Sequence, residues 1–243
     1  MSKKYWLILI SFIVMQLSTS LVALLLIQFG FQGTEAELLG TAILITFSIG
    51  FVVIGLLALK AKPDEEFIRN RTSGGETIVW IIAGIFLAYA AQIVAGMIEM
   101  YLFGIEPGSE NTQVIVDWAN AVPLLIIVVA VLVPIMEEIV FRMVIFGSLY
   151  KRFGFWIAAL LSGFIFAVVH MDFEHLLVYL AMGIVFAWLY VKTKRIIVPI
   201  MAHVGINSFV MLVQVIFGEQ IQDLIEQMEE MEAMIQAIIG GLF

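Results

Sequence analysis

The sequence predicts an all-α fold, a polytopic membrane bundle of about seven transmembrane helices. Of its 243 residues, 63% are hydrophobic and 13% are charged, whereas soluble domains have about 45–50% apolar residues. This composition excludes a water-soluble enzyme. Seven apolar runs approach the ~20 residues that span a hydrocarbon core of about 30 Å. They are residues 5–29, 38–59, 77–102, 121–150, 155–171, 176–191 and 196–217.

The positions of the basic residues predict how the bundle is oriented. Cytoplasmic loops carry an excess of Lys and Arg. Eleven of the 12 basic residues precede the first run or lie in every second gap: Lys3, Lys4, Lys60, Lys62, Arg69, Arg71, Lys151, Arg152, Lys192, Lys194 and Arg195. We therefore expect a cytoplasmic N-terminus and a C-terminus outside. The net charge of −8 disfavours nucleic-acid binding, which requires a surplus of basic residues, and we expect no nucleic-acid partner.

The individual runs are consistent with retained transmembrane helices. The first run follows Lys3 and Lys4 but is longer than the roughly 7–15 apolar residues of a secretory signal. The fourth run is long enough to include an interfacial piece, so eight helices is the alternative count. Residues 63–76 are polar and contain Thr72-Ser73-Gly74-Gly75, which indicates a cytoplasmic loop. We expect a transmembrane domain over residues 1–218.

The C-terminal segment, residues 219–243, has a different pattern. Its apolar residues recur at alternating spacings of three and four, which is typical of an amphipathic helix. They are Ile221, Leu224, Met228, Met231, Ile235 and Ile238. Acidic residues occupy the positions between them. We expect an acidic amphipathic helix that lies on the bundle or the membrane interface, or that joins two copies of the chain in a homo-oligomer.

Strongly polar residues occur inside three of the predicted membrane helices. A charged side chain at the bilayer centre costs about 2.5–3.5 kcal/mol on insertion scales, so such residues indicate a functional site. They are Glu137, Glu138, Arg142, His170, His203 and Asn207. His175 stands at a loop edge and is expected at the membrane interface.

Helical spacing predicts different roles for these residues. Glu138 and Arg142 are four residues apart and can form an ion pair on one helix face. Glu137 points about 100° away from Glu138 and is the carboxylate without a local partner. His203 and Asn207 are also four residues apart, so both project toward one place. At about 1.5 Å per residue, the polar groups lie roughly 12–27 Å from the basic ends and can meet inside the membrane.

Two prolines are close to these polar groups. Pro134 precedes Glu137 by three residues, and Pro199 precedes His203 by four. Because proline lacks a backbone donor, we expect each to kink its helix beside the site. Such kinks would favour a cavity that holds water.

Three motifs in chain order carry a resemblance to a known family. They are Glu-Glu-x-x-x-Arg at 137–142, Phe-x-x-x-His at 166–170 and His-x-x-x-Asn at 203–207. This arrangement resembles the CPBP family of intramembrane proteases, which includes the type II CAAX prenyl endopeptidases and the bacteriocin-processing or self-immunity proteins, also called Abi. The resemblance covers a motif core over residues 134–207, and the first three helices and the tail carry no matching motif.

The resemblance implies that the protein is an endopeptidase acting on a membrane-associated peptide or protein. It implies that Glu137 is the catalytic carboxylate and that His170 assists it in activating a water molecule. His203 and Asn207 would stabilise the oxyanion of the tetrahedral intermediate. Such donors are worth several kcal/mol in a water-poor site.

The remaining motif residues are implied to support the site. These are Glu138, Arg142 and Phe166. Many family members have Gly after the motif Arg, where this chain has Met143, so packing or substrate approach beside Arg142 differs here. We expect the substrate to approach from the cytoplasmic side or laterally between helices.

Several alternatives remain open at this point. Glu137, His170 and His203 have the ligand types of a zinc site, although we expect no cofactor. The motif His-Glu-x-x-His does not occur, no Asp lies in a predicted membrane core, and Ser162-Gly163 has no clear paired His. The other function classes are a non-catalytic membrane scaffold or bacteriocin-immunity protein and, with less support, a proton-coupled transporter. In each case we expect an integral protein of the plasma membrane.

Overall fold

The computed structural model of the chain describes residues 2–61, 65–106 and 108–240, and these residues form helices and connecting turns without a strand. The predicted all-α class is thereby confirmed. The helices are α1 (Lys3–Gln28), α2 (Glu35–Lys60), α3 (Glu65–Ile68), α4 (Gly74–Phe103), α5 (Glu110–Ala121), α6 (Leu125–Ile127), η1 (Val128–Leu132), α7 (Val133–Glu137), η2 (Glu138–Phe146), α8 (Gly147–Val169), α9 (Leu176–Thr193) and α10 (Ile197–Gly240). The elements η1 and η2 are π-helical.

Among the described residues, five helices are long and apolar enough to cross a membrane: α1, α2, α4, α9 and the first half of α10. The predicted fourth and fifth runs supply two more spans. The fourth run comprises α6 to η2 and the first turns of α8. Gly154 separates it from the fifth, because its φ of 73° breaks the helical geometry of α8. A left-handed φ is readily adopted by glycine. The prediction of about seven spans is confirmed.

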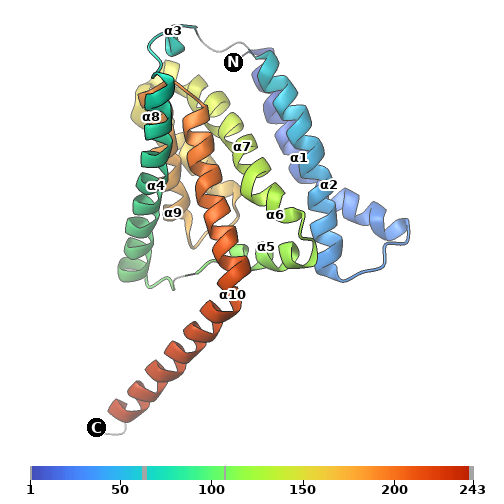
Figure 1. The fold of residues 1–243 in the computed structure, drawn as a ribbon, viewed down its shortest axis with the longest axis vertical. Coiled ribbons are helices and arrows are strands. Elements are labelled where there is room, and N and C mark those ends of the chain that lie inside the picture. The colour runs from blue at the N-terminus through green and yellow to red at the C-terminus, as the bar shows by residue number, and fades with distance from the viewer. Residues whose placement is uncertain (1, 62–64, 107, 241–243) are drawn as a thin grey trace.

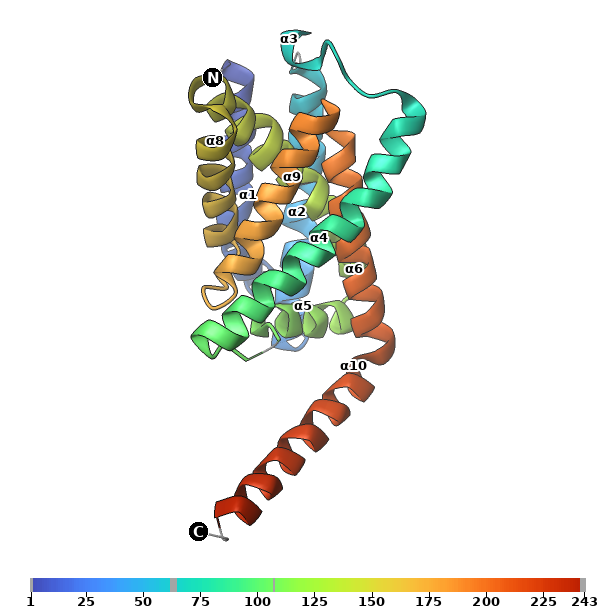
Figure 2. The same ribbon diagram turned by 90° about the vertical axis from the view of Figure 1, so that its left-hand side faces the viewer.

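The bundle has two distinct ends (Figures 1 and 2). The N-terminus, α3 and the start of α10 lie at one end, and α5 lies at the other. The described basic residues among those predicted to be cytoplasmic belong to the first end, which we call the basic end, and Lys62 lies outside the described residues. The helix α5, which the sequence analysis did not predict, lies across the opposite end. Which end faces the cytoplasm remains a prediction.

Side-chain hydroxyls define where several helices begin. Thr34 accepts a hydrogen bond from the Glu37 backbone N–H, and the Glu37 side chain accepts one from Thr34. Ser73 and Glu76 form the same reciprocal capping box at the start of α4. These caps satisfy donors that the first helical turn leaves free. They fix the helix starts at opposite ends of the bundle.

The N-terminal helices pack behind the segment that carries the glutamates. Ile8 and Phe12 of α1 and Ile54 of α2 form a buried cluster with Met136 and Phe141. Phe12 meets Phe141 edge to face at a centroid distance of 5.8 Å. This packing holds the α7–η2 segment against α1 and α2, which also contribute Gln16, Ile43 and Phe47 to the cavity that contains Glu137. The first two helices therefore support the motif core, although they carry no motif.

The C-terminal segment continues α10 to Gly240 and extends away from the bundle in both views (Figures 1 and 2). Met231 is exposed. The side chains of Ile221, Leu224, Met228, Ile235 and Ile238 lie outside the described set, as do residues 241–243 entirely. The predicted apolar stripe and its role in a homo-oligomer therefore remain predictions.

Candidate active site

The glutamate-bearing helix departs from α-helical hydrogen bonding on both sides of Pro134. In η1, the Val133 backbone N–H donates to the Val128 carbonyl, five residues back. The element η2 begins at Glu138 and continues the π-helical geometry to Phe146. Because proline lacks an N–H, it interrupts the regular ladder, and π-helical turns are frequent at functional sites. The predicted distortion at Pro134 thus takes the form of two π-helical segments.

The expected kink at Pro199 is wrong. Pro199 lies in the first turn of α10, which begins at Ile197. The first N–H groups of a helix have no intrahelical acceptor, so proline removes no hydrogen bond there. His203 and Asn207 project from the same α-helix four residues apart.

Glu138 and Arg142 form the predicted ion pair, and both side chains are completely buried. Arg142 Nε lies 3.1 Å from Glu138 Oε2. The guanidinium carbon lies 4.4 Å from the centroid of the Phe166 ring and 5.3 Å from that of Phe186. Arg142 Nη1 and Nη2 have no hydrogen-bond acceptor among the described residues. The aromatic faces therefore provide most of the surroundings of this charge.

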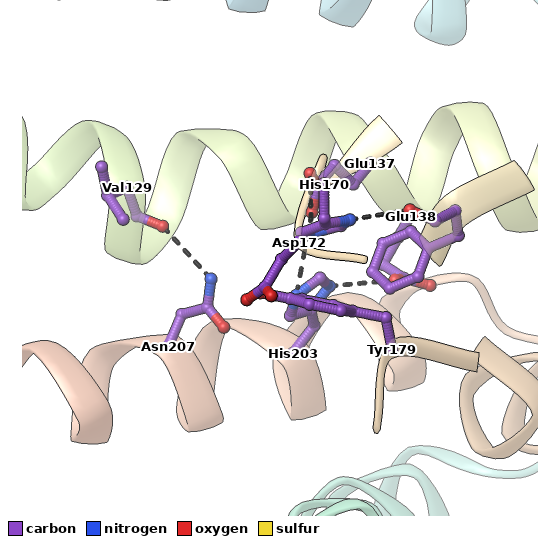
Figure 3. A network of polar contacts seen from close by, with 9 residues as sticks. Val129, Glu137, Glu138, His170, Asp172, Tyr179, His203 and Asn207 are labelled. Atoms are coloured by element: carbon purple, nitrogen blue, oxygen red, sulfur yellow. Dashed lines mark hydrogen bonds and ion pairs between the residues drawn. The ribbon is translucent and has the colours of Figure 1, made fainter. Parts of the chain in front are cut away.

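Glu137 faces two imidazole rings, as Figure 3 shows. Its Oε1 lies 3.8 Å from His170 Nε2, and its Oε2 lies 3.8 Å from His203 Nε2. These separations exceed a direct hydrogen bond. Glu137 is buried, with 7% of its surface exposed, and it lines a cavity of about 340 Å³ together with both histidines. A group bound in this cavity can reach the carboxylate and the two ring nitrogens.

Each imidazole is held through its other nitrogen. His170 Nδ1 lies 2.7 Å from the Phe166 carbonyl oxygen, and His203 Nδ1 lies 3.0 Å from Glu138 Oε1. A carbonyl oxygen can only accept, so Nδ1 of His170 carries the hydrogen and its Nε2 is directed toward Glu137. Glu138 thus binds Arg142 with one oxygen and His203 with the other, which links the first and third motifs.

Asn207 lines the same cavity but lies apart from the two imidazoles (Figure 3). Its Nδ2 donates to the Val129 carbonyl of η1 at 3.4 Å. The amide has a second N–H that this bond does not use. The structure therefore places all four predicted catalytic residues on one cavity, with Glu137, His170 and His203 in close proximity and Asn207 at its edge.

Tyr179 and Asp172 belong to the site but were not predicted from the sequence. The Tyr179 ring stacks on His170 at a centroid distance of 4.2 Å. Its hydroxyl donates to Asp172 Oδ2 at 3.4 Å, and Ser109 Oγ donates to the same oxygen at 2.7 Å. These contacts join the start of α5 to the ring that faces Glu137. Tyr179 lies three residues into a predicted span, where an aromatic residue is ordinary, so the sequence did not indicate a role in the site.

A third buried carboxylate, Glu99 of α4, was also missed. Its Oε1 accepts hydrogen bonds from the backbone N–H groups of Leu177 and Val178, and its Oε2 lies 3.0 Å from His175 Nδ1. Glu99 therefore satisfies the first N–H groups of α9, where a negative charge is stabilised by the helix dipole. His175 is thereby held at the end of the bundle opposite the basic end.

The described residues include no group of three or more His, Cys, Asp or Glu side chains arranged to hold a metal ion. The alternative zinc site from Glu137, His170 and His203 receives no support from this geometry. The expectation that no cofactor is used remains a prediction.

The fold and the site together define a class: a polytopic helical membrane protein with a buried carboxylate and two imidazoles facing one cavity. Residues 119–209 match the family described as "Type II CAAX prenyl endopeptidase Rce1-like". This match covers the glutamate-bearing helix and the three helices that follow it. It includes all three motifs.

Curated relatives extend the similarity beyond the motif core. The chain is 46% identical over 251 residues to "Putative membrane peptidase YdiL" of Bacillus subtilis (strain 168), with 100% of both chains covered. It is 34% identical to "Membrane-embedded CAAX protease MroQ" of Staphylococcus aureus (strain USA300), over 76% of this chain and 77% of that protein. It is 28% identical to "UPF0177 protein YxdF" of Lactococcus lactis subsp. lactis (strain IL1403), over 65% of this chain and 88% of that protein. No solved structure matches the chain.

The chain belongs to the CPBP family of membrane CAAX protease-like proteins, as its motifs predicted. It is an integral membrane protein of the peptidase class.

Proposed function

We propose that the protein is an intramembrane endopeptidase that hydrolyses a peptide bond of a membrane-associated peptide or protein. One observation carries this proposal: the Glu137 carboxylate faces His170 Nε2 and His203 Nε2 at 3.8 Å each across a shared cavity. A water molecule bound here would lie within reach of a base and beside a hydrogen-bond donor for the carbonyl.

In the first step, Glu137 takes a proton from this water while His170 Nε2 orients it. The resulting hydroxide attacks the carbonyl carbon of the scissile bond, and the carbonyl oxygen becomes an oxyanion. When the tetrahedral intermediate collapses, Glu137 returns the proton to the leaving amine. The carboxylate is then regenerated, and one water molecule has been consumed per bond.

His203 and Asn207 stabilise the oxyanion in this mechanism. The Nδ1–H of His203 donates to Glu138, so donation from Nε2 to the substrate requires a second proton on the ring. The second N–H of Asn207 supplies the other hydrogen bond. No metal ion takes part in this scheme.

The lining of the cavity supports substrate approach from the α5 end rather than from the basic end. The α5 residues Thr112 and Trp118 line the cavity that contains Glu137. A second cavity of about 440 Å³ adjoins it and shares Gln92, Thr112, Tyr179 and Val210. With the basic end cytoplasmic, the scissile bond would enter from the opposite side of the membrane, or laterally near it. The membrane itself would be the plasma membrane.

The proposal is tested in cells by comparing the membrane peptides of strains that carry the wild type or Glu137→Gln. Glutamine keeps the size and polarity of the side chain but removes the base, so the substrate should accumulate uncleaved and its products should disappear. A membrane scaffold or immunity protein would keep its activity in this variant. An unchanged peptide profile, with the variant present at normal abundance, would contradict proteolysis.

A further inference from the structure

A third cavity, of about 730 Å³, opens at the basic end of the bundle and is separate from the proposed active site. Four basic residues line it: Arg71, Lys151, Lys194 and Arg195. Glu65 is the acidic residue among its described lining. The four cations come from three chain segments, the α3–α4 turn, the first turns of α8 and the α9–α10 turn. The cavity therefore combines a positive rim with enclosure by several elements.

The turn between α9 and α10 is fixed in place rather than freely solvated. Arg195 Nε donates to the Thr72 carbonyl at 2.6 Å. The Thr72 backbone N–H and hydroxyl both donate to the Thr193 carbonyl, at 3.1 and 3.3 Å. These bonds tie the α9–α10 turn to the segment that carries Arg71. The backbone segments that carry Arg71, Lys194 and Arg195 are thus held together by the fold.

Lys194 has a backbone conformation in which lysine is unusual. It caps α9 with φ 56° and ψ 23°, the left-handed geometry that glycine usually provides at this position. A non-glycine residue there carries a conformational cost. The side chain is directed over the Phe67 ring, with Nζ 4.3 Å from its centroid. Burial lowers the pKa of Lys194, so an anion beside it would stabilise its charge.

Apolar side chains line the cavity beside the basic ones. They include Phe67, Met143 and Ile196, together with the hydroxyl-bearing Ser148. A basic pocket between helices at the cytoplasmic face is the arrangement that binds phosphate-bearing lipid headgroups. A lining that combines basic and apolar side chains suits an amphiphilic ligand better than a free ion.

We propose that this cavity binds the phosphate group of an anion, with Arg71, Lys194 and Arg195 around the phosphate oxygens. A membrane phospholipid or a soluble phosphate could supply this group, and the apolar side chains of the lining favour the phospholipid. The site is independent of the Glu137 chemistry. It would anchor the α3–α4 and α9–α10 turns to the surrounding lipid.

Native mass spectrometry of the delipidated full chain in detergent tests the proposal, with added phosphatidylglycerol, phosphatidylcholine or inorganic phosphate. We expect phosphatidylglycerol to bind more tightly than phosphatidylcholine. The double variant Arg71→Gln/Lys194→Gln should bind phosphatidylglycerol roughly thirtyfold more weakly, since each basic contact contributes about fivefold. If inorganic phosphate binds the wild type as tightly as phosphatidylglycerol does, and the double variant loses this binding, the site is supported and its ligand is a soluble phosphate.

The matched control is Lys3→Gln/Arg152→Gln, which removes the same charge from the same end of the bundle but outside the cavity lining. It should change the affinity by less than about threefold. Lys194→Gly is a second variant that relieves the left-handed strain, so it should keep or raise the unfolding temperature while weakening lipid binding about fivefold. Equal loss in the cavity and control variants, or binding of neither phosphatidylglycerol nor inorganic phosphate at this cavity, would overturn the proposal.

Discussion

The buried Arg142 charge is stabilised by one carboxylate and by aromatic rings, and this makes it sensitive to the loss of its partner. Replacing Arg142 by Met should destabilise the protein by about 3–5 kcal/mol, because Glu138 would remain buried without its ion pair. The double variant Glu138→Gln/Arg142→Met removes both charges and should recover more than half of this loss. The free energy of unfolding in detergent micelles, measured for a double-mutant cycle, checks this expectation. Strictly additive losses would contradict the pairing.

The Glu99–His175 contact predicts a pH-dependent contribution to stability. Burial lowers the pKa of His175, but the hydrogen bond to Glu99 and the nearby carboxylates together raise it by more than burial lowers it. The pKa of His175 therefore lies above its ordinary value. A histidine whose pKa is raised by folding stabilises the fold below its unfolded pKa of about 6.5. This contribution is lost as the pH rises through the folded pKa.

We therefore expect the unfolding temperature of the wild type to exceed that of Glu99→Gln by more at about pH 5.5 than at about pH 8.5. Thermal unfolding of both proteins at the two pH values measures this difference. The glutamine retains an oxygen that can accept from Leu177 and Val178, so the comparison isolates the charge. A gap independent of pH would show that His175 does not titrate against Glu99.

The residues that could be predicted from the sequence either pair along their own helix or are polar within an apolar run. Glu138 and Arg142 pair at a spacing of four, and the polarity of Glu137 and His203 in apolar helices already indicated a site. Contacts between helices gave no such signal: Tyr179 looked like an ordinary aromatic residue of a span. Glu99 is as buried as Glu138, but it lies near a helix end, where a carboxylate is unremarkable.

At the scale of the elements, the close crossing of α8 and α9 positions the second motif. A Cβ built on Gly183 would lie 2.8 Å from the Gly163 Cα. The backbones of α8 and α9 therefore approach closely at this pair of glycines, which have no side chains to separate them. These two helices carry His170 and Tyr179. Their separation therefore sets the position of the imidazole that faces Glu137.

Gly183→Ala should destabilise the protein by about 1–3 kcal/mol, because the added methyl group must push the two backbones apart. Gly55→Ala is the matched control, since a Cβ at Gly55 of α2 meets no atom within 4 Å. That substitution should be neutral or stabilise the helix by up to about 1 kcal/mol. Equal unfolding temperatures for the two variants would show that the α8–α9 crossing tolerates separation.

The sequence predicted the long spans but not the elements that shape the cavity. Apolar length identified α1, α2, α4, α9 and α10, because lipid imposes that length on any helix crossing it. The helix α5 is short and mixed in polarity, so apolar length could not reveal it. The π-helical segments η1 and η2 depend on how the helix packs, and Pro134 indicated only that a distortion would occur.

At the scale of the whole molecule, the end of the bundle that faces the cytoplasm determines from which side of the membrane the substrate enters. The natural sequence contains no cysteine, so single cysteines report accessibility without background. A membrane-impermeant maleimide should label Glu174→Cys in intact cells and Lys192→Cys only after permeabilisation, since basic loops remain in the cytoplasm. Both positions are exposed. The reverse labelling pattern would invert the predicted orientation and the side from which substrate enters.

In the proposed mechanism, Glu137 activates the water that cleaves the substrate. The cleavage rate of a membrane peptide substrate in proteoliposomes, measured for the wild type, Glu137→Gln and Glu99→Gln, tests this role. Loss of a general base should lower the rate by about 10²–10⁴-fold in Glu137→Gln. Glu99→Gln neutralises a buried carboxylate away from the reaction and should retain the rate within about threefold. If Glu137→Gln, folded as the wild type, cleaves the peptide at the wild-type rate, Glu137 is not the base and the mechanism is contradicted.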